Sequence, residues 1–229
     1  MNFPAIAKQT YEKLRSQPAF SNITQFVIEH LKKISSPLER ARFIHHVVDD
    51  YNREIFAHPL VQKFLPCKSG CSGCCHTQVG ITEDEAELLA ERVNDGLKID
   101  YALLKKQIKA GNNPEEYYTL SYENRRCIFL GADDSCQAYN DRPSVCRTNA
   151  VLGEASQCSP HVGDAEPETI RLVKTEQADM AIIGSFLMSK ESGTLALMVG
   201  QILLKNNKLP MTSKYYEPSK KSVSKDIDL

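Results

Sequence analysis

The chain has 229 residues, of which 41% are hydrophobic, and its 28 basic and 29 acidic side chains leave a formal net charge of -1. This composition excludes a chain that is disordered throughout, because it contains enough apolar side chains to form a core. The balanced charge provides no global field that would attract nucleic acid or an anionic membrane, so we expect neither as a partner.

The sequence begins without the apolar run that a secretory signal needs, and its best apolar stretches, AIIGSFLM and LALMVGQILL, are too short to cross a bilayer. The sequence therefore favours a reducing cytoplasm. In that compartment the eight cysteines are not expected to form structural disulfides, because clustered cysteines there more often bind metal or perform redox chemistry.

The first third of the chain is predicted to be helical. Apolar residues recur at three- and four-residue spacing in three segments, 11–17, 23–34 and 37–56. Ser36 caps the third segment, and Pro37 suits its first helical position. His58-Pro59 and Leu65-Pro66 then interrupt the pattern.

The segment CKSGCSGCCH, residues 67–76, is predicted to be a loop, because glycine and serine separate its thiols. Val79 to Ile81 is expected to be extended. Thr82 and Glu85 then form a capping box for a helix that ends at Gly96. A second helix is predicted from about Tyr101 to Ala110, with Gly111 at its end.

The region from Asn112 to Ala165 shows no lasting periodicity and contains the other four cysteines. Residues 126–130 are predicted to form a short strand, followed by a turn. Two helices, broken near Ser192-Gly193, are expected from Pro167 to Asn206. We therefore predict a mostly α-helical single domain over residues 1–209, in which irregular Cys-rich loops within 67–158 converge on a metal site, and a flexible polar tail at 210–229.

All eight cysteines are candidate metal ligands: Cys67, Cys71, Cys74, Cys75, Cys127, Cys136, Cys146 and Cys158. Convergent thiolates repel one another unless a cation neutralises them, and a sulfur-rich shell selects zinc, Cu(I) or an iron–sulfur cluster. A closed zinc site usually uses two short cysteine hooks, and only the first group has that spacing. The irregular second group favours an iron–sulfur cluster of the [4Fe–4S] type, with zinc as the alternative.

The adjacent pair Cys74-Cys75 leaves the number of metal centres open. Neighbouring side chains in an extended chain point in opposite directions, so the pair either serves two centres or supplies one ligand. His76 is a conceivable ligand or hydrogen-bond donor, and His161 is a weaker candidate near Cys158. The remaining histidines are expected to be structural.

The second cysteine group ends in a segment with two arginines. Pro143 suits the first turn of a short helix with Asp141 near its cap, which would place Cys146 in that turn. Arg142 and Arg147 bracket Cys146 and are predicted to bind the cofactor by donating to sulfur, which raises the reduction potential of a cluster. The alternative is that both arginines form surface salt bridges.

The three stretches CKSGCSGCC, RCIFL and SCQAYNDRPSVCR together resemble the YkgJ-type cysteine-cluster family. That family has a zinc- or iron-chelating domain with a C-x2-C-x2-C-C-like signature and a second half close to C-x-F-L, then C-x-I-Y-x-x-R-P-x-x-C-R. The matching positions are Cys127, Phe129, Leu130, Cys136, Tyr139, Arg142, Pro143, Cys146 and Arg147. Ala138 replaces the isoleucine. The resemblance covers about Cys67 to Arg147.

The resemblance implies metal binding. A group related to this family, the flagellin lysine methylases, has a similar cysteine arrangement. The chain shows no glycine-rich nucleotide fingerprint. Cys67, Cys71 and Cys74 have the C-x3-C-x2-C spacing of radical enzymes, but the repeated strand–helix pattern of their barrel is missing.

Three functions stay open: an iron–sulfur protein with a redox or group-transfer role, a structural zinc-binding interaction protein, and a protein lysine N-methylase. A single catalytic cysteine would need a histidine held beside it, which the sequence cannot place. The partner or substrate is expected to be a protein of unknown identity.

Overall fold

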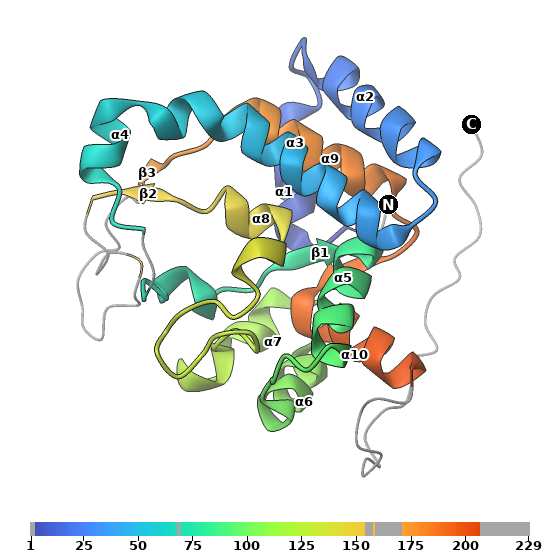
Figure 1. The fold of residues 1–229 in the computed structure, drawn as a ribbon, viewed down its shortest axis with the longest axis vertical. Coiled ribbons are helices and arrows are strands. Elements are labelled where there is room, and N and C mark those ends of the chain that lie inside the picture. The colour runs from blue at the N-terminus through green and yellow to red at the C-terminus, as the bar shows by residue number, and fades with distance from the viewer. Residues whose placement is uncertain (1–2, 68–69, 154–157, 159–170, 207–229) are drawn as a thin grey trace.

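The computed structural model describes residues 3–67, 70–153, 158 and 171–206 (Figure 1). Ten α-helices run through these residues: α1 (Ala5–Leu14), α2 (Phe20–Lys33), α3 (Pro37–Ala57), α4 (Pro59–Phe64), α5 (Glu83–Asn94), α6 (Tyr101–Ala110), α7 (Pro114–Tyr118), α8 (Ser144–Arg147), α9 (Glu176–Met188) and α10 (Leu195–Lys205). Short 3-10 helices and strands connect them: η1 (Gly73–His76), η2 (Glu123–Arg125), η3 (Tyr139–Asp141), β1 (Gly80–Thr82), β2 (Val151–Leu152), β3 (Arg171–Leu172) and β4 (Ser192–Thr194). The predicted mostly helical fold is confirmed.

Helix α9 is the centre of one half of the molecule. It is apolar on nearly all sides, and α1, α2 and α3 pack around it. The core between these helices contains Leu14, Val27, Ile44, Val48 and Ile183, each at most 1% exposed. Burial on all sides explains why α9 has no polar face.

Helix α10 is the centre of the other half, where it packs against α5 and α6. Ile128 and Phe129, from the irregular cysteine segment, belong to the same core. Each of α5 and α10 is preceded by a short strand, and these strands, β1 and β4, pair antiparallel with Ile81 opposite Gly193. The helices therefore hold the second cysteine group through buried apolar contacts.

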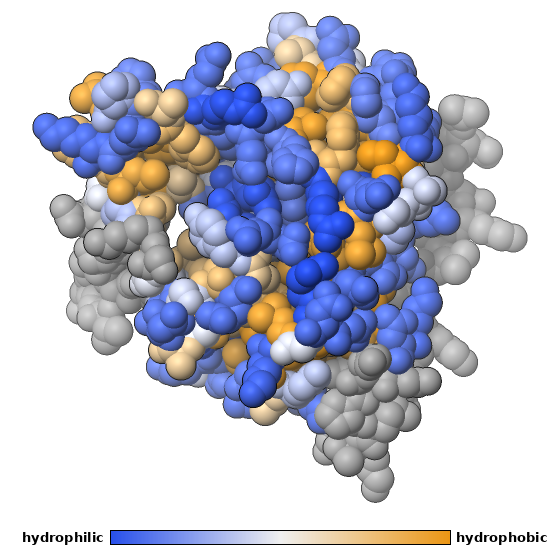
Figure 2. All heavy atoms as spheres, viewed as in Figure 1, coloured by the Kyte–Doolittle hydropathy of each residue, from blue (hydrophilic) through white to orange (hydrophobic). Residues whose placement is uncertain are grey.

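A third, smaller core lies beside α4. It contains Val61, Ala150 and Val173, and Cys67 packs against it. Strands β2 and β3 pair antiparallel there. Figure 2 shows hydrophilic residues over much of the face that carries α3, and apolar residues gathered near α4, where Leu60 and Phe64 are exposed.

Most predicted helix boundaries are confirmed. Ser36 caps α3, with Pro37 in the first turn, and the capping box of Thr82 and Glu85 starts α5. The helices α5 and α6 are followed by Gly96 and Gly111, whose φ angles of 108° and 61° suit glycine. The first helix, however, begins and ends earlier than the predicted 11–17, and α4 and α7 were not predicted.

The predicted strand at residues 126–130 is wrong. The chain turns there, with the Leu130 amide donating to the Cys127 carbonyl at 3.0 Å, and only a single bridge joins Leu130 to Cys136. The apolar run Ile128-Phe129 fits the buried side of this turn rather than a strand. The predicted tail at 210–229 lies outside the described residues. None of the described helices has the length and apolar character needed to cross a bilayer.

Candidate metal centre

The first thiol loop ends in a tight 3-10 turn. Cys74 and Cys75 both lie in η1, where the Cys75 amide donates to the Ser72 carbonyl at 2.8 Å. The two thiols interact, since each shifts the pKa of the other. The expectation that neighbouring cysteines point in opposite directions assumed an extended chain, and it does not apply to this turn. The reason is the backbone: the chain is helical at this point and not extended.

A backbone hydrogen bond joins the two thiol loops. The Cys127 amide donates to the Cys75 carbonyl at 2.7 Å. Beyond Cys127 the chain folds back, and the Gln137 amide donates to the Phe129 carbonyl at 2.8 Å, which brings Cys136 beside Leu130. Cysteines far apart in the sequence therefore approach one another.

Helices α6 and α7 hold the chain immediately before Cys127. The buried Gln107 side chain donates to the carbonyls of Asn124 and Arg126 at 3.0 and 2.7 Å. The Tyr117 hydroxyl donates to the carbonyl between them, that of Arg125, at 2.9 Å. Side chains from two helices thus satisfy three successive carbonyls, an arrangement that no local sequence pattern indicates.

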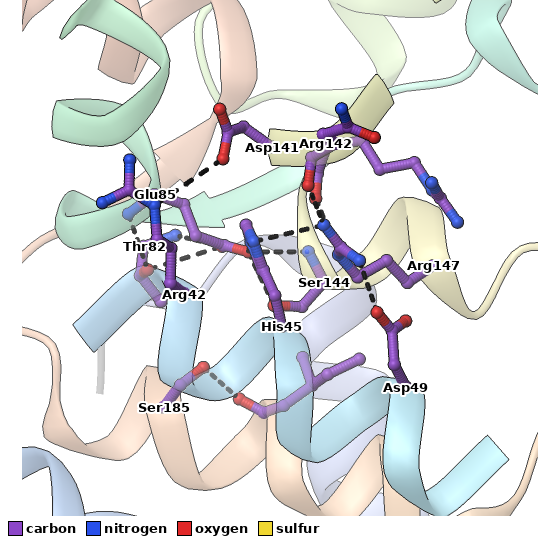
Figure 3. Close-up of polar contacts among 12 residues, drawn as sticks. Arg42, His45, Asp49, Thr82, Glu85, Asp141, Arg142, Ser144, Arg147 and Ser185 are labelled. Atoms are coloured by element: carbon purple, nitrogen blue, oxygen red, sulfur yellow. Dashed lines mark hydrogen bonds and ion pairs between the residues drawn. The ribbon is translucent and has the colours of Figure 1, made fainter. Parts of the chain in front are cut away.

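Glu85 holds the helix that carries Cys146. Its Oε1 accepts from the Ser144 amide and hydroxyl, both at 2.7 Å, at the start of α8 (Figure 3). Its Oε2 accepts from Thr82, and Nε2 of His45 donates to Oε1 at 3.3 Å. Burial raises the pKa of Glu85, but the bonds from His45 and Ser144 outweigh it, so the pKa lies below its ordinary value.

Asp141 does not cap α8, contrary to the sequence-based expectation. Pro143 occupies the cap position and Glu85 satisfies the first amide of the helix. The Asp141 carboxylate instead lies 3.4 Å from the Arg92 guanidinium and 3.9 Å from that of Arg42. The capping group thus comes from a distant helix, which a local pattern cannot reveal.

The two predicted cofactor-binding arginines have different surroundings. Arg147 is buried and turned toward α3, where Nη1 donates to Asp49 at 2.6 Å and Nη2 contacts Nδ1 of His45 (Figure 3). Arg142 stacks on the Tyr139 ring at 3.9 Å and acts electrostatically on Cys136. Only Arg142 therefore faces a thiol through the contacts described.

Arg126 is a second cation beside the thiols, and it was not singled out from the sequence. It acts electrostatically on Cys127, which follows it in the chain, and its guanidinium donates to the Gly131 carbonyl. His76 is buried, donates from Nδ1 to the Ser72 carbonyl at 3.1 Å and stacks on Tyr122. His161 lies outside the described residues.

Cys74 interacts electrostatically with thiols of both cysteine groups. It lies within electrostatic range of Cys127, Cys136 and Cys146 from the second group. It also lies within range of Cys67 and Cys158. The structure therefore brings both groups together, as the sequence predicted for the loops.

The thiols differ in acidity. Burial raises the pKa of Cys127 to about 12 and that of Cys158 to about 11. The pKa of Cys146 is also raised, first by burial and then by the neighbouring thiols. The bond from Cys75 lowers the pKa of Cys74 to about 7 and raises that of Cys75. Without a cation, most of these thiols keep their protons.

The donor set fits a thiophilic metal. The backbone amides of Val151, Phe129 and Ala138 act to lower the pKa values of Cys67, Cys127 and Cys136 respectively, against the larger effect of burial. Such amides stabilise metal-bound thiolates. Among the described residues, no three Cys, His, Asp or Glu side chains are already gathered tightly enough to hold an ion. A metal would therefore draw the loops closer as it replaces the thiol protons.

Comparison with protein families gives one result. A family model named CxxCxxCC and described as "Putative zinc- or iron-chelating domain" matches residues 66–181, about half of the chain. A comparison with curated proteins gave no match. A comparison with solved structures gave none either. The matched range includes all eight cysteines.

Proposed function

Because the chain belongs to the CxxCxxCC family of zinc- or iron-chelating domains, we propose that it is a cytoplasmic iron–sulfur protein with a redox or group-transfer role. The proposed cluster is of the [4Fe–4S] type and uses cysteines from both loops. We call its four ligands the inner set, which consists of Cys75, Cys127, Cys136 and Cys146. A reducing compartment suits a chain in which all eight cysteines are free thiols.

The convergence of the two loops carries this proposal. Cys75 is joined to Cys127 by the backbone bond of 2.7 Å, and Cys146 lies within electrostatic range of Cys127 and Cys136. The wide and irregular spacing of these ligands suits the perimeter of a cluster better than that of a single ion. Zinc would more naturally use short paired hooks.

The chain's own residues would set the properties of the site. A bound cluster supplies one-electron transfer or a Lewis-acidic iron. The backbone amides of Phe129 and Ala138 and the cations Arg126 and Arg142 favour the charged form of Cys127 and Cys136, because each acts to lower the pKa of one of these thiols. Both effects favour the more negative, reduced state and so raise the reduction potential.

Anaerobic purification of the full chain tests the proposal. We expect iron and acid-labile sulfide in equal amounts, about four of each per chain, with a broad visible absorption that bleaches on reduction. Zinc in stoichiometric amount, with neither iron nor sulfide, would show that the domain is a structural zinc module. Growth in iron-rich medium ensures that zinc does not simply replace scarce iron.

A further inference from the structure

The short helix η3 presents an aromatic ring on the surface beside the second thiol loop. Tyr139, its first residue, is 59% exposed, and tyrosine is one of the side chains that contribute most to binding at protein interfaces. Tyr139 follows Cys136 by three residues, so the Cα atoms of the two lie no more than about 11 Å apart. A molecule that docks on this ring therefore lies close to the thiols.

The backbone of η3 is held from beneath by buried groups. Nε of Arg147 donates to the Arg142 carbonyl at 3.1 Å, and Nη2 of Arg147 donates to the Asn140 carbonyl. Guanidinium groups from α3 and α5 hold the Asp141 carboxylate. The exposed Tyr139 ring is therefore part of a restrained surface, which loses little conformational entropy when a partner binds.

Arg142 completes this surface. Its guanidinium stacks on the Tyr139 ring at 3.9 Å, and Nη1 donates to the Tyr139 carbonyl at 3.0 Å. Figure 3 shows its side chain turned away from His45 and Glu85. Among the residues that the structure describes, no carboxylate lies within ion-pair distance of Arg142. The stacked guanidinium can therefore donate to an acceptor on another molecule, and its planar shape suits a carboxylate.

Positive charge predominates around η3. Within the described part of the chain, three guanidinium groups have ion-pair contacts with only two carboxylates there; the five residues are Arg42, Arg92, Arg142, Asp95 and Asp141. The acidic residues Asp133 and Asp134 belong to the turn before Cys136, where Asp134 pairs with Arg126 at 3.4 Å. The side of Cys136 that carries η3 is therefore suited to an acidic partner.

We propose that Tyr139 and Arg142, which we call the docking pair, bind an acidic electron-transfer protein. A carboxylate of the partner pairs with Arg142, and the partner's surface covers the Tyr139 ring. One electron passes from the reduced cluster to the oxidised cofactor of the partner, and no bond or proton changes. This inference rests on the proposed iron–sulfur function, to which it adds the class of partner and the place where it docks.

Two one-electron oxidants of opposite charge test the docking pair. The full chain with a reduced cluster is mixed in stopped flow, at low ionic strength, with hexacyanoferrate(III), an anion, or with hexaammineruthenium(III), a cation. Arg142→Glu should slow the reaction with the anion several-fold and accelerate the reaction with the cation, because the charge at the docking pair changes sign. Added salt should reduce both changes.

The opposite signs separate docking from a changed reduction potential. A lower potential raises the driving force for both oxidants, so it shifts both rates in the same direction. Arg53→Glu, which reverses the charge of an exposed arginine on α3, is the matched control and should leave both rates close to those of the wild type.

A redox-inert anion measures docking without electron transfer. Hexacyanocobaltate(III) has the same charge as hexacyanoferrate(III), and its cobalt NMR line broadens when it binds to a protein. We expect less broadening with Arg142→Glu, and also with Tyr139→Ala, which keeps the charge but removes the ring that holds the guanidinium in place. Arg53→Glu should broaden the line as the wild type does.

The outcomes separate this inference from the proposed function. An iron-free chain would overturn the proposed function and the electron step together, while the line width would still decide whether an anion docks at this face. In a chain that holds its cluster, equal effects of Arg142→Glu and Arg53→Glu would overturn the docking pair and leave the cluster assignment intact. So would rates that shift in the same direction for both oxidants, or a line width that neither variant of the docking pair changes.

Discussion

Glu85 shows how one side chain can place a thiol that it does not bind. It completes the capping box of α5, and with the same carboxylate it caps α8. Cys146 is the third residue of α8, so the helix backbone fixes its position. Nδ1 of His45 faces Arg147, so Nε2 carries the proton that His45 donates to Glu85. The buried network therefore links α3, α5 and α8.

Glu85→Gln tests this role. The Gln side chain keeps the volume of Glu but is uncharged, and its NH2 group replaces one of the two accepting oxygens. We therefore expect the free energy of unfolding to fall by about 3 kcal/mol. Urea denaturation measures it. Glu87→Gln, at a partly exposed position on the same helix, should leave the midpoint nearly unchanged.

The Glu85→Gln substitution should also change the acid sensitivity of the protein. The pKa of Glu85 is lower in the folded chain than its ordinary value, so its contribution to stability is complete above the ordinary carboxylate range and is lost as the pH falls through the folded pKa. The Gln variant should lose this part of the pH dependence. Identical denaturation midpoints and pH profiles for wild type and variant would contradict the assignment.

The two arginines beside Cys146 should respond differently to substitution. Arg142→Gln removes the charge near Cys136 and should lower the reduction potential of a bound cluster, on the order of tens of millivolts, with little loss of stability. Arg147→Gln leaves Asp49 without its partner and should lower the melting temperature instead. Potentiometric titration and thermal denaturation measure the two effects; equal shifts of potential for both variants would refute the distinction.

Among the elements, α6 acts as a support for the second cysteine group. Gln107 is 4% exposed and bonds two carbonyls that precede Cys127. Gln107→Met keeps the size of the side chain but leaves both carbonyls unsatisfied, so we expect a loss of about 1–3 kcal/mol in the free energy of unfolding.

The same variant should release metal faster in a chelator assay, because the backbone before Cys127 is no longer held. Gln25→Met, at an exposed position on α2, is the control and should behave as the wild type does. Unchanged stability and metal release in Gln107→Met would show that α6 does not support the site.

For helices and turns, the sequence predicted correctly the boundaries that depend on neighbouring residues. Ser36, the capping box at Thr82, and Gly111 at the end of α6 were each read from neighbouring residues. The 3-10 conformation of η1 and the short α8 were harder to foresee, because tertiary contacts hold them. The capping group of α8 is Glu85 of α5, and the local sequence around Asp141 and Pro143 does not reveal this distant partner.

For the whole molecule, the presence of a cysteine-based metal site could be predicted, but its internal arrangement could not. The clustered cysteines and the two matching motifs can be recognised in the sequence alone, and they indicate metal binding. The bond between Cys127 and Cys75, and the contact of Gly73 with Cys158, join residues far apart in the sequence. The direction of Arg147 depends in the same way on Asp49 in α3.

Metal should also stabilise the fold as a whole, because its ligands would come from loops that are far apart in the sequence. Anaerobic treatment with a strong chelator should lower the melting temperature, by about 2–4 °C for each kcal/mol of lost binding free energy. Restoring the metal should reverse the shift. A melting temperature independent of metal content would mean that the helices alone hold the loops in place.

The most direct test of the account is the iron content of two variants, Cys75→Ser from the first loop and Cys146→Ser from the second. If both loops hold one cluster, each variant loses most of the iron of the wild type while its helical circular dichroism is kept. If either variant, still folded, retains the iron content of the wild type, the two loops do not share a cluster.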